Sequence, residues 1–316
     1  MRRFEYTSPQ TADAAVRMLS SEGAAALAGG TDILSLMKDG AAAYSRLVNL
    51  KGIRGLGGIR NTDAGMEIGA TAKLGDLLEH HGLVTMFPAV AEAAMGVGSR
   101  QVLSMRTVGG DLCARPRCWY FRAGFGLVPM HDGESMAKQG DNRYHAIFGN
   151  SGAAVFVNPS SLAPPLIALG ASATIHGADG PRTIALEDLY RTPASSDESE
   201  FTLGFGEIVT HVTIPPPSSQ NATYEVRNRK GMDWPLATAS VAVSDGAARV
   251  VLGHVAPTPW MSAAAGEALA GGLTDASAAA AGDAAVADAR ALSGNGYKIQ
   301  LTRVAVKRAA LAARGG

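Results

Sequence analysis

Two pairs of adjacent glycines constrain the fold of this chain more than any other feature of its sequence. Gly29-Gly30 follows a short apolar run, residues 24–28, that we interpret as a buried strand, and precedes a helical stretch over residues 33–38. Glycines let the backbone turn sharply and point successive N–H groups at one place, where the N-terminus of the next helix adds its positive end. This pattern predicts a pyrophosphate cradle. The alternative is a plain turn in which Thr31 or Asp32 caps the helix.

The second pair, Gly109-Gly110, lies within residues 107–111 and has the same character. On its own it is equally consistent with an ordinary tight turn. Two such backbone cradles, 80 residues apart, would suit a dinucleotide that contacts both of them. Thr31 and Ser35 add hydroxyl groups to the first cradle.

The charge balance excludes one broad class of function. The chain has 316 residues with 28 basic and 28 acidic side chains, whereas a nucleic-acid-binding domain normally carries a basic surplus on one face. Its length favours two or three compact units, and it has no run of about 18 apolar residues that would indicate a membrane span. Two cysteines, Cys113 and Cys118, are too few for a disulfide framework or, by themselves, for a four-thiolate metal site.

Apolar periodicity and turn residues indicate how the chain is organised. Residues 112–150 are polar and punctuated by glycine, and loops of that length are usually functional or disordered. Successive prolines in residues 215–219 predict a linker, and Asp245-Gly246 beyond it predicts a hairpin turn. We expect helices over 11–21, 74–80 and 89–95, strands over 46–50, 66–69, 222–228, 236–244 and 247–256, an Ala-rich helical region over 262–291, and a last helix through Tyr297, Leu301, Val304 and Leu311.

Sharper catalytic motifs are absent. Residues 55–60 begin like a dinucleotide fingerprint but end in Arg60 with no convincing strand before them, so we reject a Rossmann site. Residues 149–153 resemble a nucleophile elbow but lack its final glycine. The histidines have no partners at metal-ligand spacing, so we expect no catalytic residue and no metal ligand in this chain. Residues 100–125 contain five arginines, Arg100, Arg106, Arg115, Arg117 and Arg122, which predict a solvated surface, a docking face for an acidic partner, or contacts to phosphate. The same segment contains four aromatic residues, which predict either a packed loop or a shield for a cofactor.

Taken together, the motifs resemble the FAD-binding medium subunit of the molybdenum hydroxylases, the family of xanthine dehydrogenase, carbon monoxide dehydrogenase and aromatic aldehyde oxidoreductase. The resemblance rests on Ala28-Gly29-Gly30-Thr31-Asp32, Thr107-Val108-Gly109-Gly110-Asp111 and Pro159-Ser160-Ser161-Leu162-Ala163-Pro164. It extends to residues 253–259 and to Gly296-Tyr297-Lys298, and it covers nearly the whole chain. Each motif alone is weak, whereas their order and spacing are specific.

The resemblance implies an α+β fold. A FAD-binding domain of the vanillyl-alcohol oxidase (PCMH) type would cover residues 1–217, with subdomains of about 1–55 and 56–217. A smaller C-terminal domain of the CO-dehydrogenase-flavoprotein type, with three strands plus helices, would cover residues 222–316.

The same resemblance implies which residues contact FAD. They come from the two glycine turns and one later loop: Ala28, Gly29, Gly30, Thr31, Asp32, Ile33, Leu34, Ser35, Thr107, Gly109, Gly110, Asp111 and Ser161. Asp111 stands where the family usually has Asn, and Ser161 where many relatives have Asp. Glu225 stands where some relatives place a lysine near the flavin, and we do not transfer that role to a residue of opposite charge.

Residues 111–122 most resemble the aldehyde-oxidoreductase branch, in which some members carry a [4Fe–4S] cluster in the loop that follows. Cys118 matches the first cluster cysteine, and no cysteine follows it. Because a cluster needs about four thiolates, we expect this chain to have lost the cluster and to keep the aromatic residues and arginines for packing and docking.

The implied function is that of a FAD-carrying electron-transfer subunit in a heterotrimer. A large subunit would carry the molybdenum cofactor and a small subunit [2Fe–2S] clusters, and the FAD would pass electrons from the iron–sulfur partner to NAD, a quinone or oxygen. Two alternatives stay open: a stand-alone flavin oxidase of the vanillyl-alcohol type, and a non-catalytic assembly subunit that has lost FAD. The expected location is the cytoplasm, with export through a partner's signal left open.

Overall fold

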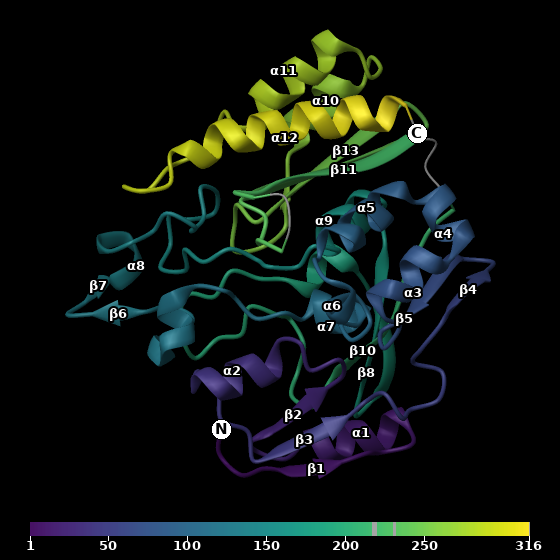
Figure 1. The fold of residues 1–316 in the computed structure, drawn as a ribbon, viewed down its shortest axis with the longest axis vertical. Helices are drawn as coiled ribbons and strands as arrows, with labels where there is room; N and C mark the ends of the chain where they lie inside the picture. Colours follow the sequence, from purple (N-terminus) through teal and green to yellow (C-terminus); the bar gives the residue numbers. More distant parts are fainter. Residues whose placement is uncertain (217–219, 230–231, 316) are drawn as a thin grey trace.

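The computed structural model describes residues 1–216, 220–229 and 232–315 and arranges them as three main sheets with helices packed against them (Figure 1). This mixture of helix and mostly antiparallel sheet is the α+β class that the sequence predicts. Part of the predicted linker, residues 217–219, lies outside the described residues. Among the described helices, none combines the length and apolar character needed to cross a membrane.

The sheet nearest the N-terminus is small and parallel. Strand β3 (Arg46–Asn49) lies between β1 (Glu5–Thr7) and β2 (Ala24–Leu27). Helix α1 (Ala12–Leu19) joins β1 to β2 and buries one apolar face, and α2 (Ile33–Asp39) follows β2. Strand β2 lies at the edge of this sheet, and the first glycine turn follows its carboxyl end.

The central sheet has five antiparallel strands, and its middle strand comes from far along the chain. The order is β4 (Ile59–Thr62), β5 (Gly65–Gly69), β10 (Ile208–Ile214), β8 (Ser172–Gly177) and β9 (Gly180–Ala185). The sequence pattern missed β10, which pairs with both β5 and β8. Short helices pack on this sheet through the largest apolar core: α3 (Leu74–Glu79), α4 (His81–Met86), α5 (Pro88–Gly96), α7 (Val108–Leu112) and α9 (Ala163–Ala168), while α6 (Arg100–Leu103) leads into the second glycine turn.

The C-terminal sheet is antiparallel, in the order β11 (Gln220–Val226), β12 (Ala237–Ser244), β13 (Ala247–Gly253) and β14 (Trp260–Met261). The first three strands are those predicted, and β14 adds a fourth of two residues. The predicted hairpin at Asp245-Gly246 is confirmed, and both residues have the positive φ of a type I′ turn.

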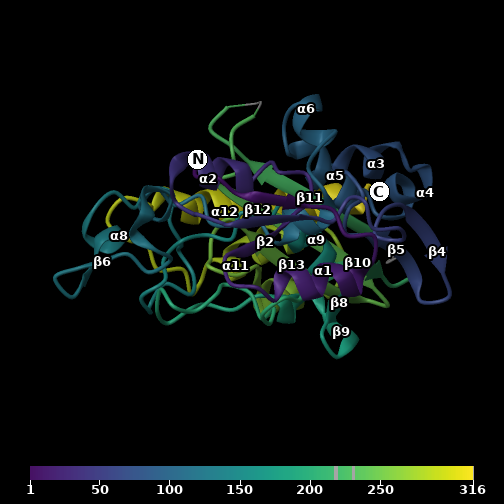
Figure 2. The ribbon, with the colours of Figure 1, turned by 90° about the horizontal axis from the view of Figure 1, so that it is seen from below.

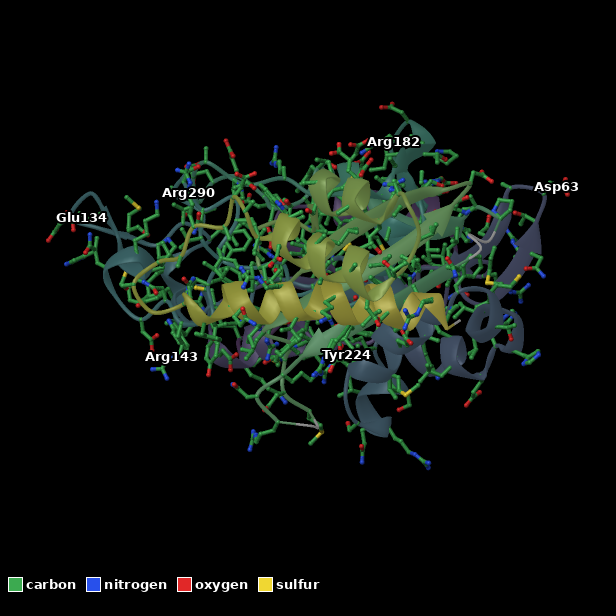
Figure 3. All side chains as sticks on the ribbon, turned by 90° about the horizontal axis from the view of Figure 1, so that it is seen from above. Asp63, Glu134, Arg143, Arg182, Tyr224 and Arg290 are labelled. Carbon is green, nitrogen blue, oxygen red and sulfur yellow. The ribbon has the colours of Figure 1, made fainter. Side chains whose placement is uncertain are left out.

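Three helices cover the C-terminal sheet: α10 (Ala263–Leu269), α11 (Asp275–Ala285) and α12 (Tyr297–Arg314). The Ala-rich region forms two helices rather than one, because Gly271-Gly272 interrupts it. Helix α12 runs along the sheet beside Tyr224, whose ring lies 5.1 Å from the Arg308 guanidinium carbon (Figure 3).

The predicted irregular loop, residues 112–150, contains short elements of its own. It holds a helical turn at Phe121–Phe125, the hairpin β6 (Met130–His131) with β7 (Glu134–Ser135), and α8 (Met136–Gln139). This hairpin and β4 lie at opposite ends of the molecule (Figure 2). Ile147 and Phe148 then enter the C-terminal core, so the loop contacts the sheet that the predicted division near residue 217 separates from it. That division stays a prediction.

Candidate cofactor-binding site

The first glycine turn is pressed against the segment that leads into the second. Gly30 has φ 73°, in the left-handed region that favours glycine. A Cβ on Gly29 would overlap the Met105 carbonyl oxygen and lie 2.7 Å from its carbonyl carbon and 3.2 Å from the Arg106 Cα. Two turns that are far apart in the sequence therefore meet in space, and only glycine permits this approach.

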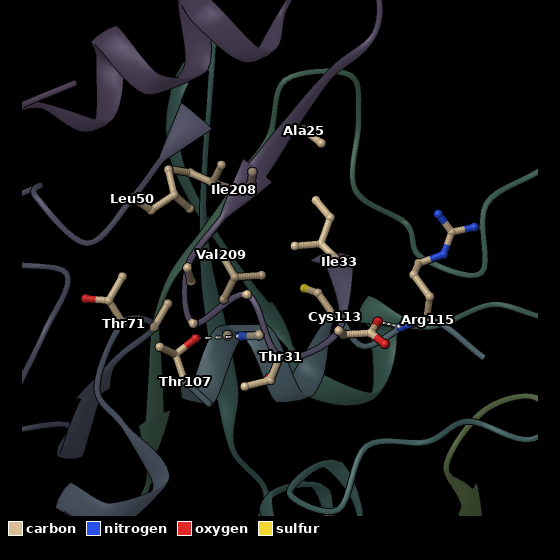
Figure 4. A pocket seen from close by; sticks show the side chains of 18 of the residues that line it. Ala25, Thr31, Ile33, Leu50, Thr71, Thr107, Cys113, Arg115, Ile208 and Val209 are labelled. Atoms are coloured by element: carbon tan, nitrogen blue, oxygen red, sulfur yellow. Dashed lines mark hydrogen bonds between the residues drawn. The ribbon is translucent and has the colours of Figure 1, made fainter. Parts of the chain in front are cut away.

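The second turn is the start of helix α7. Thr107 caps that helix, its Oγ1 accepting a hydrogen bond of 3.1 Å from the Gly110 N–H (Figure 4). The Gly109 N–H donates to the Ala70 carbonyl at 2.8 Å, and a Cβ on Gly109 would lie 2.9 Å from the Ala70 Cβ. The second turn is thus fixed against the residue that follows β5.

Both turns open on one cavity of about 280 Å³, which we call the first cavity (Figure 4). Of the residues predicted from sequence, nine line it: Ala28, Gly29, Gly30, Thr31, Asp32, Ile33, Thr107, Gly109 and Gly110. Leu34, Ser35, Asp111 and Ser161 do not. The rest of its wall is mostly apolar and comes from β2, β10 and the loops beside them: Ala25, Ala26, Leu36, Tyr44, Leu50, Ala70, Thr71, Cys113, Arg115, Phe201, Leu203, Glu207, Ile208 and Val209.

The sequence does not predict most of the residues that form this apolar wall. Val209 belongs to β10, and Phe201 pairs with Tyr190 through an isolated bridge, so both depend on long-range pairing. Cys113 also lines the cavity, where burial, aided by the nearby Glu200 and Asp111 carboxylates, raises the pKa of its thiol to about 12. The wall is therefore neutral at this position.

Asp32 anchors the long loop to the first turn. Its Oδ2 accepts a hydrogen bond of 2.8 Å from the Arg115 backbone N–H, and its Oδ1 lies 2.7 Å from Arg122 Nη2 and 3.5 Å from Arg117 Nη1. Figure 4 shows the contact with Arg115 at the edge of the first cavity. The sequence leaves the arginine cluster open as a solvated surface, a docking face or a set of phosphate contacts. Two of its members, Arg117 and Arg122, have a structural role here, since they pair with Asp32.

Asp111 is fully buried and faces away from the first cavity. Its Oδ1 accepts from Arg106 Nε at 2.7 Å, and its Oδ2 accepts from Ser160 Oγ at 2.6 Å and from the Leu162 N–H at 2.9 Å. The carboxylate ties α7 to the later loop that contains Ser161. Asp111 therefore holds the second glycine turn and the loop of Ser161 against each other.

Ser161 lines a second cavity of about 200 Å³, which shares Thr31 with the first cavity. Arg106 and Trp234 also line it, and the guanidinium carbons of Arg106 and Arg117 lie 5.4 and 4.8 Å from the Trp234 ring centroid. These are cation–π distances. The second cavity thus combines an aromatic face with positive charge.

Glu225 lies behind this second cavity. It pairs with Arg227, which lines the cavity, and it packs beside Gly96 at the end of α5. Burial raises the pKa of the Glu225 carboxyl to about 7, and the charge of Arg227 opposes that shift. Glu225 is therefore placed to hold Arg227 at the cavity wall.

A third cavity, of about 330 Å³, adjoins the second through Arg117 and Trp234. Cys118 lines it with its Sγ 3.2 Å from His145 Nε2. Burial raises the pKa of the Cys118 thiol and lowers that of His145 to about 4, so the pair is a neutral thiol and imidazole. Among the described residues, no group of three or more His, Cys, Asp or Glu side chains could hold a metal ion.

Two buried imidazoles of this third cavity predict acid sensitivity. Burial, reinforced by the charge of Lys298, lowers the pKa of His254 to about 3 and that of His145 to about 4. Below about pH 6.5 the unfolded chain takes up a proton on each imidazole, whereas the folded chain does not. The free energy of unfolding should therefore fall by about 1.4 kcal/mol per pH unit and imidazole as the pH drops from about 6.5 towards 4.

Denaturant unfolding at a series of pH values measures this slope. His254→Asn should lower this slope by about 1.4 kcal/mol per pH unit, because asparagine tolerates the positive φ of this position and carries no titrating group. The exposed His81→Gln is the matched control and should keep the slope. An unchanged slope in His254→Asn would contradict the assignment.

Comparisons with known proteins agree with these features. The family model described as the FAD binding domain in molybdopterin dehydrogenase matches residues 2–217. The chain is 32% identical to the aldehyde oxidoreductase FAD-binding subunit PaoB of Escherichia coli, over 96% of each chain. It is 28% identical to the carbon monoxide dehydrogenase medium chain of Afipia carboxidovorans, over 97% of this chain and 95% of that one.

Solved structures show the same arrangement of the chain. A chain of carbon monoxide dehydrogenase from Hydrogenophaga pseudoflava superposes with a TM-score of 0.76 at 26% identity, over 99% of this chain and 98% of that one. A chain of quinoline 2-oxidoreductase from Pseudomonas putida 86 gives 0.75 at 20% identity, over 99% and 97%. The second likeness concerns the fold alone.

Proposed function

The chain belongs to the FAD-binding medium subunits of the molybdenum hydroxylases, and on that premise we propose that it holds one FAD across the first and second cavities. The observation that carries the proposal is the meeting of the two glycine turns at one cavity. The N–H groups of the first turn and the Thr31 hydroxyl would hold the pyrophosphate, where the two cavities join. The second turn would form the facing wall, because its Gly109 and Gly110 N–H groups already donate to the Ala70 carbonyl and to Thr107 Oγ1. A cavity of about 280 Å³ is near the lower limit for small-molecule sites, so a dinucleotide needs both cavities.

The two cavities differ in a way that distinguishes the halves of the cofactor. The first has a largely apolar wall, including Leu50 and Val209, that suits the adenosine half. The second offers the Trp234 ring and the Arg106 guanidinium, which suit the flavin half and its changing charge. The residues of this chain would thus bind and orient the cofactor, and exclude water from it.

When bound, FAD takes up electrons singly or in pairs, so it can link one-electron carriers to two-electron acceptors. The relatives are medium chains or subunits of multi-subunit complexes. For this chain we propose a large partner with the molybdenum cofactor and a small partner with [2Fe–2S] clusters, and an acceptor that is NAD, a quinone or oxygen. The contacts of Asp32 with Arg115 and Arg117 would hold the loop that begins at Arg115 over the joined cavities.

Co-purification with metal and flavin analysis tests this proposal. We expect one FAD, one molybdenum and about four iron atoms per heterotrimer, the iron belonging to two [2Fe–2S] clusters on the small partner. About four additional iron atoms on this chain would contradict the predicted loss of the [4Fe–4S] cluster. A colourless chain that FAD cannot reconstitute would favour an assembly subunit, and oxidation of an added alcohol by the chain alone would favour a stand-alone oxidase.

A further inference from the structure

A buried ion pair lies between the two halves of the proposed site. Arg106 and Asp111 form it, with side chains 4% and 0% exposed. Arg106 immediately precedes Thr107, and its own Cα is among the atoms that a Cβ on Gly29 would approach. The pair therefore lies where both glycine turns meet.

The pair leaves one donor of Arg106 without a protein partner. Its Nε donates to Asp111, whereas its Nη2 is buried and, within the part of the chain that the structure describes, has no hydrogen-bond partner. Leaving a buried donor unsatisfied costs about 1–3 kcal/mol, and more for a charged group. Arg106 lines the second cavity, so a ligand there is placed to satisfy this donor.

Both oxygens of Asp111, by contrast, have partners within the chain. They accept from Arg106, Ser160 and Leu162, and Asp111 does not line the second cavity. The ion pair is neutral as a whole, but its positive end lines the second cavity, whereas its negative end, on α7, faces the loop of Ser160 and Leu162. Asparagine, the usual residue of the family at this position, would hold the same loop without the negative charge.

We propose that Arg106 contacts the flavin end of the bound FAD and raises its reduction potential, with Asp111 moderating the effect. This inference rests on the proposed function, because it needs FAD in the second cavity. Reduction by two electrons from the iron–sulfur partner, with uptake of one proton, leaves the cofactor with one more negative charge. A cation with a free N–H donor stabilises that reduced form more than the oxidised one, since charge-assisted hydrogen bonds are the stronger kind.

The alternative contact for Arg106 is the pyrophosphate, whose charge does not change on reduction. Contact there would strengthen the binding of oxidised and reduced FAD equally and leave the potential unchanged. The two contacts are therefore separated by a redox measurement, and a purely structural role for the pair would also leave the potential unchanged.

The test uses the full-length chain loaded with FAD, in three forms: the native chain, Asp111→Asn, and the double variant Arg106→Ala with Asp111→Asn. The double variant removes both charges, so no buried carboxylate is left unpaired. Equilibration with reference dyes gives the potential, and flavin fluorescence gives the affinity for oxidised FAD.

In the double variant we expect the preference for reduced over oxidised FAD to fall about tenfold, which for a two-electron couple is a shift of about 30 mV to lower potential. Asp111→Asn alone keeps the cation and removes its counter-charge, so its potential should rise. This opposite sign keeps the inference testable even if the double variant binds FAD poorly.

Unchanged potentials in the FAD-loaded variants would overturn the inference and leave the proposed function intact. A native chain that binds no FAD would instead refute the proposed function. A loss of affinity without a change of potential would assign Arg106 to the pyrophosphate.

Discussion

Gly29→Ala is expected to abolish FAD binding. The new methyl group would overlap the Met105 carbonyl oxygen and approach the Arg106 Cα, and these are backbone atoms that cannot move aside like the end of a side chain. The two glycine turns must then separate, which widens the mouth of the first cavity and misplaces the N–H groups that face it. We expect FAD affinity to fall at least 100-fold, or about 3 kcal/mol, in the range of other overpacked buried sites.

Flavin content after purification and fluorescence titration with added FAD measure this effect. Gly271→Ala is the matched control, because nothing lies within 4 Å of a Cβ at that position in the connection between α10 and α11. Thermal unfolding of both variants separates a local loss of binding from global unfolding. A Gly29→Ala chain that retains native flavin content and affinity would show that the close approach of the two turns has no part in binding.

Local sequence signals were sufficient for most of the secondary structure. The strands of the C-terminal sheet and the hairpin at Asp245-Gly246 follow from alternation and turn residues, which act between neighbours in the chain. The sequence pattern does not predict β10 as a strand, because its place in the central sheet depends on pairing with β5, about 140 residues earlier. The Ala-rich region was predicted as helical, but the break at Gly271-Gly272 was not, since alanine dominates the propensity of the whole stretch.

The candidate site shows the same division between local and long-range information. The glycine turns are visible in the sequence because each pair lies close to a threonine and the first pair precedes a predicted helix, and the structure brings both pairs to one cavity. Arg106 is predicted only as one of five arginines that could contact phosphate, and Trp234 is not predicted as a cofactor contact, because its place beside Arg106 depends on contacts between segments far apart in the sequence. Asp111 was predicted as a cofactor contact from the resemblance. Its three hydrogen bonds to Arg106, Ser160 and Leu162 became visible only once the loops were placed.

Asp32→Asn is expected to lower the free energy of unfolding by about 3 kcal/mol. Asp32 and Arg122 are 13% and 12% exposed, and removing one partner of such a largely buried pair leaves the other charge uncompensated. The amide also loses one of the two acceptor oxygens that now serve Arg115 and Arg122. The loop that begins at Arg115 should therefore detach from the first turn before the rest of the molecule unfolds, and hydrogen exchange should show earlier exchange there.

Asp32→Asn has two opposite effects on FAD binding: the loss of a negative charge should favour it, whereas the loss of the contacts that hold the loop should weaken it. Removing a carboxylate from the edge of the first cavity leaves Arg117 and Arg122 less neutralised, and this alone would favour the anionic pyrophosphate. A weaker affinity in Asp32→Asn would therefore mean that the anchored loop, rather than local charge, sustains the site. Asp39→Asn on the same helix is the control: its carboxylate is exposed, so stability should change by less than about 0.5 kcal/mol. A tighter affinity in Asp32→Asn with unchanged hydrogen exchange would show that Asp32 acts through its charge alone.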